Sequence, residues 1–193
     1  MTQTPEHFST LVKLYQEMDQ TWDLVAQQYG FQCNGCEDNC CLSLFFHHTY
    51  AEASFLQYGF QTLPPKDQAH ILALSQAYCR QTFSDDNQAI SKKIPCPLLK
   101  EERCSLYNFR PMICRMHGLP HELHKPGVNI IKGPGCDAGK FDSLTYIPFD
   151  RTPFYKQMAA IEMNFRQLTG KTGKIKKTIA QILMDSMPDT KAP

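Results

Sequence analysis

The sequence predicts a mainly α-helical fold with a small β-hairpin, in which irregular cysteine-rich loops wrap around a metal centre. Apolar residues recur at helical spacing towards both ends, a hairpin pattern lies in the middle, and cysteines gather where no periodicity is seen. The 193 residues are 42% hydrophobic and 20% charged, as in a folded globular protein. We expect a single domain over residues 1–193, with flanking helices in residues 1–30 and 150–193 and a cysteine-cluster region over residues 33–136.

The first predicted helix spans about residues 6–29. Its apolar residues repeat at alternating steps of three and four, and Gly30 follows where a left-handed residue commonly ends a helix. This stripe consists of Phe8, Leu11, Tyr15, Met18, Trp22, Val25 and Tyr29. We interpret the helix as packing on a core rather than in a coiled coil.

The next two predicted helices flank a proline pair. Thr49 and Glu52 form a capping-box pattern ahead of an apolar run, which predicts the start of a helix. Pro64 and Pro65 interrupt the chain, and the pattern after them predicts a helix over about residues 66–83.

The middle of the chain predicts a hairpin. Residues 100–103 form a polar turn between two apolar runs, so that Cys96 and Cys104 would come close across the turn. Pro111 suits the first turn of a short helix that carries Cys114.

The C-terminal part begins with a long irregular segment. Residues 117–148 are rich in Gly and Pro and are expected to be mostly loop. Asp150 would cap a helix over about residues 152–168, which Gly170 would end. A last helix is expected over about residues 174–186.

Composition and the N-terminal segment favour a cytoplasmic protein. The formal net charge of +1 excludes a global basic field for nucleic acid. No apolar run approaches the roughly 20 residues of a membrane span, and the start lacks the basic and apolar regions of a signal peptide. In a reducing compartment the nine cysteines are not expected to form a disulfide framework, which leaves metal ligation as the main reason for clustering them.

Four cysteines within nine residues indicate a metal site. Cys33 and Cys36 form a CxxC pair around an Asn-Gly turn, which can bring both sulfurs to one ion. Cys40 and Cys41 are adjacent, and adjacent side chains diverge, so one four-coordinate ion does not readily take both. We therefore expect more than one metal atom, either two zinc ions or the irons of a cluster.

The second half of the chain supplies four further candidate ligands, which are Cys96, Cys104, Cys114 and Cys136. Arg110 and Arg115 lie close to Cys114 in sequence, and their charges would favour thiolates and offset the negative charge of the site. Surface solvation is the alternative interpretation of these two arginines.

Several of these segments occur together in the order of a known family. They are Cys33-x-x-Cys36-x-x-x-Cys40-Cys41, Pro95-Cys96-Pro97-Leu98-Leu99, Cys104-Ser105-Leu106-Tyr107 and Arg110-Pro111-x-x-Cys114-Arg115. Together they resemble the cysteine-cluster family typified by YkgJ, a zinc- or iron-chelating domain. The flagellin lysine N-methylases contain a similar cluster. The resemblance covers about residues 33–136, with a looser match at Cys136, and implies a cysteine-bound zinc or iron centre.

The weaker candidate ligands are His117, His121 and His124 after the last motif, and His47 and His48 after the first. They could replace a cysteine ligand or bind a second metal, and exposed loop histidines are the alternative. His117 is preferred because it lies nearest to Cys114. Cys79 falls in a helical pattern and is interpreted as a small buried hydrophobic residue.

The function that these observations favour is metal binding, with zinc ions or an iron–sulfur cluster held by cysteine thiolates. Two alternatives stay open: a metalloenzyme that modifies a protein or peptide substrate, as in the methylase relatives, and an adaptor with a purely structural metal. An open coordination position would favour the enzyme, and a closed all-cysteine shell the structural role. Metal ions are the expected partners, a protein or peptide partner stays open, and neither nucleic acid nor a membrane is expected.

Overall fold

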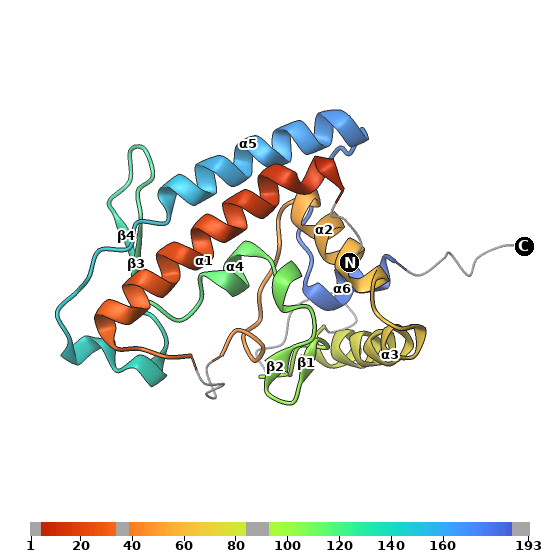
Figure 1. Ribbon diagram of the computed structural model, residues 1–193, viewed down its shortest axis with the longest axis horizontal. Helices are drawn as coiled ribbons and strands as arrows, with labels where there is room; N and C mark the ends of the chain where they lie inside the picture. The colour runs from red at the N-terminus through yellow and green to blue at the C-terminus, as the bar shows by residue number, and fades with distance from the viewer. Residues whose placement is uncertain (1–4, 34–38, 84–92, 187–193) are drawn as a thin grey trace, which may run out of the picture. The chain divides into compact units, whose positions relative to one another are not determined.

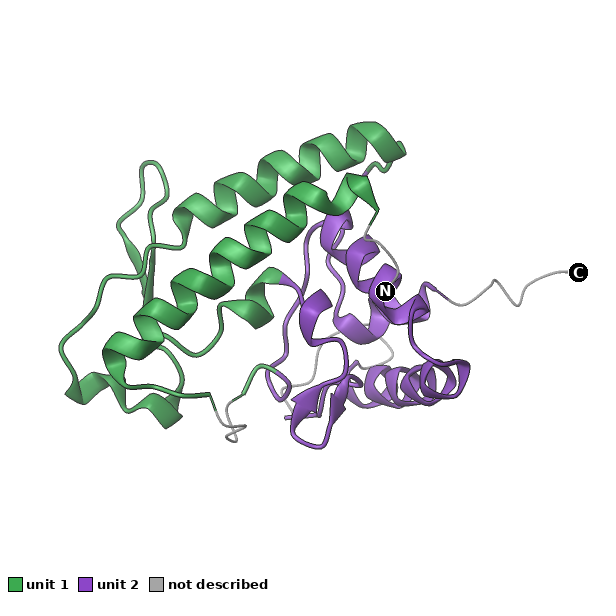
Figure 2. Cartoon of the chain, in the orientation of Figure 1, with its two compact units in different colours: residues 1–40, 112–172 green, residues 41–111, 173–193 purple. Residues whose placement is uncertain are grey.

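The computed structural model describes residues 5–33, 39–83 and 93–186. The chain divides into two compact units, with residues 1–40 and 112–172 in unit 1 and residues 41–111 and 173–193 in unit 2 (Figure 2). Each unit combines segments that are distant in sequence, and each is described by itself.

The first helix of unit 1 agrees with the prediction. The single turn η1 (Glu6–Phe8) leads into α1 (Ser9–Tyr29). Gly30 ends α1 with φ of 62°, in the left-handed region, and its N–H donates to the Gln27 carbonyl. The buried residues of the helix are Leu11, Leu14, Tyr15, Met18, Val25 and Ala26. The predicted stripe is therefore the face that packs in the core, with Trp22 only partly buried at its edge.

The second long helix of unit 1 is α5 (Thr152–Thr169), which lies beside α1 (Figure 1). The Asp150 carboxylate accepts a hydrogen bond of 2.8 Å from the Thr152 N–H, although Arg151 occupies the N-cap position. Gly170 ends the helix with φ of 67°. The predicted helix and its glycine end are confirmed.

Unit 1 contains a strand pair that was not predicted. Strand β3 (His121–Leu123) pairs antiparallel with β4 (Ile131–Gly133), inside the segment expected to be mostly loop. On its other side β3 exchanges backbone hydrogen bonds with Phe149 and Arg151. Strands of three residues are too short to show an alternating pattern, so the Pro and Gly signals dominated the prediction.

In the described part of unit 2, the α-helices α2 (Tyr50–Gln61), α3 (Pro65–Thr82) and α6 (Ile179–Met184) pack around one core (Figure 1). Thr49 caps α2 as predicted, because its hydroxyl accepts the Glu52 N–H at 3.3 Å and donates to the Glu52 carboxylate at 2.6 Å. The core of this unit consists of Ala53, Leu56, Phe60, Ile71, Leu98, Leu106, Ile175, Ile182 and Leu183.

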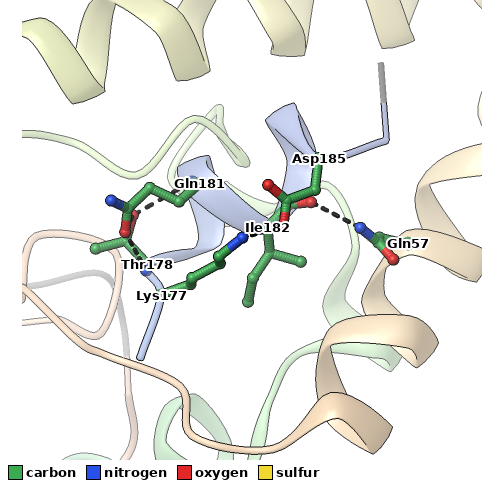
Figure 3. A network of polar contacts seen from close by, with 6 residues as sticks. All are labelled: Gln57, Lys177, Thr178, Gln181, Ile182 and Asp185. Carbon is green, nitrogen blue, oxygen red and sulfur yellow. Dashed lines mark hydrogen bonds and ion pairs between the residues drawn. The ribbon is translucent and has the colours of Figure 1, made fainter. Parts of the chain in front are cut away.

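The last helix is shorter than predicted. It begins after Thr178, which forms a complete capping box with Gln181, and the preceding residues are not helical because Lys177 pairs with the backbone of His47. Figure 3 shows α6 held by polar contacts, among them the 2.9 Å hydrogen bond from the Gln57 amide to the Ile182 carbonyl. The Thr178-x-x-Gln181 pattern was readable in the sequence and marks the true start.

The predicted hairpin exists but is very short. Strand β1 (Leu99–Lys100) pairs with β2 (Arg103–Cys104), and Glu101 and Glu102 make the turn with φ of 50° and 64°. Cys104 pairs with Leu99, and Cys96 lies before the paired strand. Prolines on both sides of Cys96 cannot donate to a ladder, which keeps the strand from extending to it.

Within the described ranges, no helix is both long and apolar enough to cross a bilayer.

Candidate metal centre

The first point in the sequence at which the chain passes from unit 1 to unit 2 falls between Cys40 and Cys41. The cysteines within the residue ranges of unit 1 are called the unit 1 set. They are Cys33, Cys36, Cys40, Cys114 and Cys136. The candidate cysteine ligands within the residue ranges of unit 2 are called the unit 2 set. They are Cys41, Cys96 and Cys104. Cys36 lies outside the described residues. The adjacent cysteines that were expected to diverge thus belong to different units.

Three segments of the unit 1 set meet around Gly118. A Cβ added to Gly118 would lie 3.7 Å from the Phe31 ring and 3.9 Å from Cys136 Sγ, and the Cys136 N–H donates to the Gly118 carbonyl at 2.9 Å. Phe31 lies two residues before Cys33. The chain leading into Cys33 and the loop after Cys114 therefore both lie next to Cys136.

The loop between Cys114 and Cys136 is held from two sides. The Trp22 indole N–H donates to the His117 carbonyl at 2.9 Å, and Trp22 also contacts Phe31, with ring centroids 6.1 Å apart. Arg151 is only 4% exposed and donates to the carbonyls of Met116 and Leu119. Burial lowers the pKa of Arg151 to about 10, and the guanidinium stays charged near neutral pH. The sequence identified Trp22 only as a core residue and gave no signal for Arg151.

The two arginines near Cys114 are buried rather than solvated. Arg115 is 5% exposed, forms an ion pair of 2.5 Å with Asp19 and lies over the Tyr15 ring. These contacts join α4 (Met112–Arg115), the short helix that carries Cys114, to α1. In unit 2, Arg110 lies 3.6 Å from the Tyr107 ring centroid and donates to the Tyr107 carbonyl. The surface interpretation of both residues is therefore excluded.

The unit 2 set is joined by backbone contacts. The Cys96 N–H donates to the Cys41 carbonyl at 2.7 Å, and the Leu99 N–H donates to the Cys96 carbonyl at 2.9 Å. Leu99 in turn pairs with Cys104, and both Cys96 and Cys104 pack against the core of unit 2. Cys79, which was expected to be a small buried residue, is partly buried on α3, and burial raises the pKa of its thiol.

The histidines separate into different environments. His47 is 3% exposed, and burial, with a smaller contribution from His48, lowers its pKa to about 4. His124 Nε2 lies 3.0 Å from the Glu122 carboxylate, and His121 Nδ1 lies 3.2 Å from the Leu119 carbonyl. His117, by contrast, directly precedes Gly118 and so lies next to the cysteine segments of unit 1.

The donors present suit zinc or iron, because thiolates are the preferred ligands of both zinc and iron–sulfur centres. In the part of each unit that the structure describes, however, no three Cys, His, Asp or Glu side chains are grouped so that they could hold an ion as they stand. Within each unit, backbone contacts bring the described cysteine segments together.

The described residues form a mainly α-helical protein that carries cysteines in both units. Residues 32–129, about half of the chain, match the family model CxxCxxCC, described as "Putative zinc- or iron-chelating domain". The chain belongs to this family. No curated protein and no solved structure matches the chain.

The cysteine pattern of this chain differs in two ways from what the family model covers. One difference is in spacing and the other is in range. Three residues separate Cys36 from Cys40, whereas the family name has two at that point. Cys136 lies beyond the matched residues, so its place among the candidate ligands depends on its contact with Gly118.

Proposed function

We propose that the protein binds zinc or iron through cysteine thiolates in two separate groups, the unit 1 set and the unit 2 set. The observation that supports this proposal is that each set has backbone contacts among its own segments within its own unit. Each set is then supported by its own contacts, around Gly118 in unit 1 and through the Cys41–Cys96 hydrogen bond in unit 2.

The size of each set decides what it can hold. The unit 1 set has five cysteines, enough for a four-coordinate site with one thiol to spare. The unit 2 set has three, which leaves a fourth position for water, another side chain or a substrate. Bound zinc would supply Lewis acidity or structural cross-linking, and an iron–sulfur cluster would supply electron transfer.

A catalytic role for the centre is the second candidate, and His117 is the residue that favours it. Its carbonyl accepts a hydrogen bond from Trp22, and the carbonyl of the next residue accepts one from the Cys136 N–H, so its backbone lies beside a cysteine of the unit 1 set. A histidine among thiolates occurs in catalytic zinc sites that keep an exchangeable ligand, and it occurs in closed structural sites as well. The substrate of such an enzyme would be a protein or peptide, by analogy with the methylase relatives.

The test is the metal content of anaerobically purified protein, combined with its absorption spectrum. Cys33→Ser and Cys114→Ser should each reduce the metal of one site, and Cys96→Ser and Cys104→Ser should each reduce that of the other. Cys79→Ser, the matched control, should keep the full content. Loss of all metal in every variant except the control would indicate one shared centre, and full retention in all of them would refute ligation by these cysteines.

A further inference from the structure

Strand β4 has one paired side and one open side. On β3, the Glu122 N–H donates to the Phe149 carbonyl at 2.9 Å, and the Glu122 carbonyl accepts the Arg151 N–H at 3.0 Å. Glu122 thus uses its backbone groups on the side of β3 away from β4, and its two neighbours in β3 bond β4. Lys132 is the partner of Glu122 in β4, so its own backbone N–H and C=O point away from β3.

These two backbone groups of Lys132 form the free edge of the hairpin. No backbone hydrogen bond joins them to another segment of the described chain. The residue is exposed, and its side chain is 64% exposed. An open pair of backbone N–H and C=O groups at the edge of a sheet is a template for a further strand.

Apolar side chains surround this edge on both faces of the hairpin. Val128, Ile130 and Ile131 are 59%, 48% and 41% exposed. Because side chains alternate along a strand, Ile130 shares a face with Lys132, and Ile131 lies on the opposite face. The Tyr146 ring centroid lies 5.1 Å from Lys132 Nζ, which adds an aromatic ring to the Lys132 face. Exposed β-branched and aromatic side chains at an open edge suit a paired strand, because they pack well against cross-strand neighbours.

Charge distinguishes between the strands that could pair here. Glu122 is the only acidic residue in residues 121–136, and its side chain is 15% exposed and lies 3.0 Å from His124 Nε2. Lys132 Nζ lies 3.7 Å from the same carboxylate but remains mostly open to solvent. A two-fold pairing of two copies centred on Lys132 would place two lysines directly opposite each other, which is destabilising. An acidic residue opposite Lys132 would instead be favourable.

We propose that β4 binds an extended peptide segment of a partner protein by antiparallel strand addition, with an acidic residue of the peptide opposite Lys132. The backbone of that residue exchanges two hydrogen bonds with Lys132, and β-branched residues on either side of it pack against the apolar edge. No cysteine takes part, so the interaction is independent of the metal binding proposed for unit 1.

The experiment titrates the isotope-labelled full-length protein with a capped heptapeptide in which valine and threonine alternate around a central glutamate. The amide resonances of Ile130, Ile131 and Lys132 should shift in a saturable manner. Methylation of the glutamate backbone nitrogen removes the donor to the Lys132 carbonyl and should weaken binding by about 2- to 10-fold. The peptide with lysine in place of the glutamate should bind about two- to fivefold more weakly.

Variants at Lys132 separate the backbone from the charge. Lys132→Gln should remove the preference for glutamate over lysine but keep the sensitivity to N-methylation. Lys132→Pro also removes the outward N–H and no hydrogen bond to β3, so it should bind the glutamate peptide more weakly than Lys132→Gln does. Lys13→Gln, the same change at an exposed lysine of α1, is the matched control and should bind as the parent does. Circular dichroism should show the same fold in all three variants.

Three results would overturn the proposal. The first is the absence of β4 shifts with the glutamate peptide at millimolar concentration. The second is equal binding of the N-methylated peptide, which would indicate charge attraction without strand pairing. The third is a change of the same amide resonances when the parent alone is diluted, which would assign the edge to a second copy of this chain.

Discussion

Gly59→Ala tests how tightly α2 packs in unit 2. A Cβ added to Gly59 would lie 2.3, 2.5 and 2.6 Å from three ring carbons of Phe109. Ordinary carbon contacts are about 3.5–4.0 Å, so the ring would have to move by about 1 Å or more. The rings of Phe55 and Tyr58, centred 5.0 and 6.1 Å from that of Phe109, restrict this movement.

Two opposing contributions decide the sign of the change in unfolding free energy. Alanine is favoured over glycine within a helix by about 1 kcal/mol. Overpacking of a core typically costs about 1–3 kcal/mol, and the displaced ring of Phe109 would also lose part of its burial. We expect Gly59→Ala to lower the unfolding free energy by about 1–2 kcal/mol, or the unfolding temperature by roughly 2–8 °C.

The assay is thermal and urea unfolding followed by circular dichroism, in the parent and in a Phe109→Leu background. Leucine removes the ring that the new methyl group would meet, so Gly59→Ala should then stabilise the protein by about 1 kcal/mol through helix propensity. An increase in stability on adding Gly59→Ala to the parent would refute the packing argument.

Four further predictions follow from single features. His47 has its pKa lowered to about 4 in the folded chain, so it binds a proton more readily in the unfolded chain. The unfolding free energy should therefore keep its full value above about pH 6.5 and fall by about 3 kcal/mol as the pH drops to about 4. Urea unfolding of His47→Leu should lack this pH dependence. Replacing Glu101-Glu102, both at positive φ, by Asn-Gly should stabilise the protein by roughly 1 kcal/mol, and an unchanged urea midpoint would contradict the turn. Fluorescence of Trp22, the single tryptophan, should change on zinc loading because its indole bonds the His117 carbonyl, and a constant spectrum at full loading would argue against metal in unit 1. Rapid alkylation of denatured, freshly prepared protein should modify all nine cysteines, whereas pairs that react only after reduction would indicate disulfides.

The sequence by itself determined most helices and the family to which the cysteine motifs belong. The glycines that end α1 and α5 and the threonine that begins α2 act on neighbours within a few residues, so their effect is visible in a short window of sequence. The cysteine motifs are equally local, and they identified the family from residues 32–129. The Thr178 capping box also marks the start of α6 in the sequence, although the prediction began that helix at about residue 174.

Only the tertiary structure decided how the cysteines are distributed. The assignment of Cys40 and Cys41 to different units depends on contacts between segments that are distant in sequence, as does the contact between Gly118 and Cys136. The three-residue strands β3 and β4 are too short to leave a periodic pattern. The burial of Arg151 is likewise a property of the packed chain that no local sequence pattern encodes.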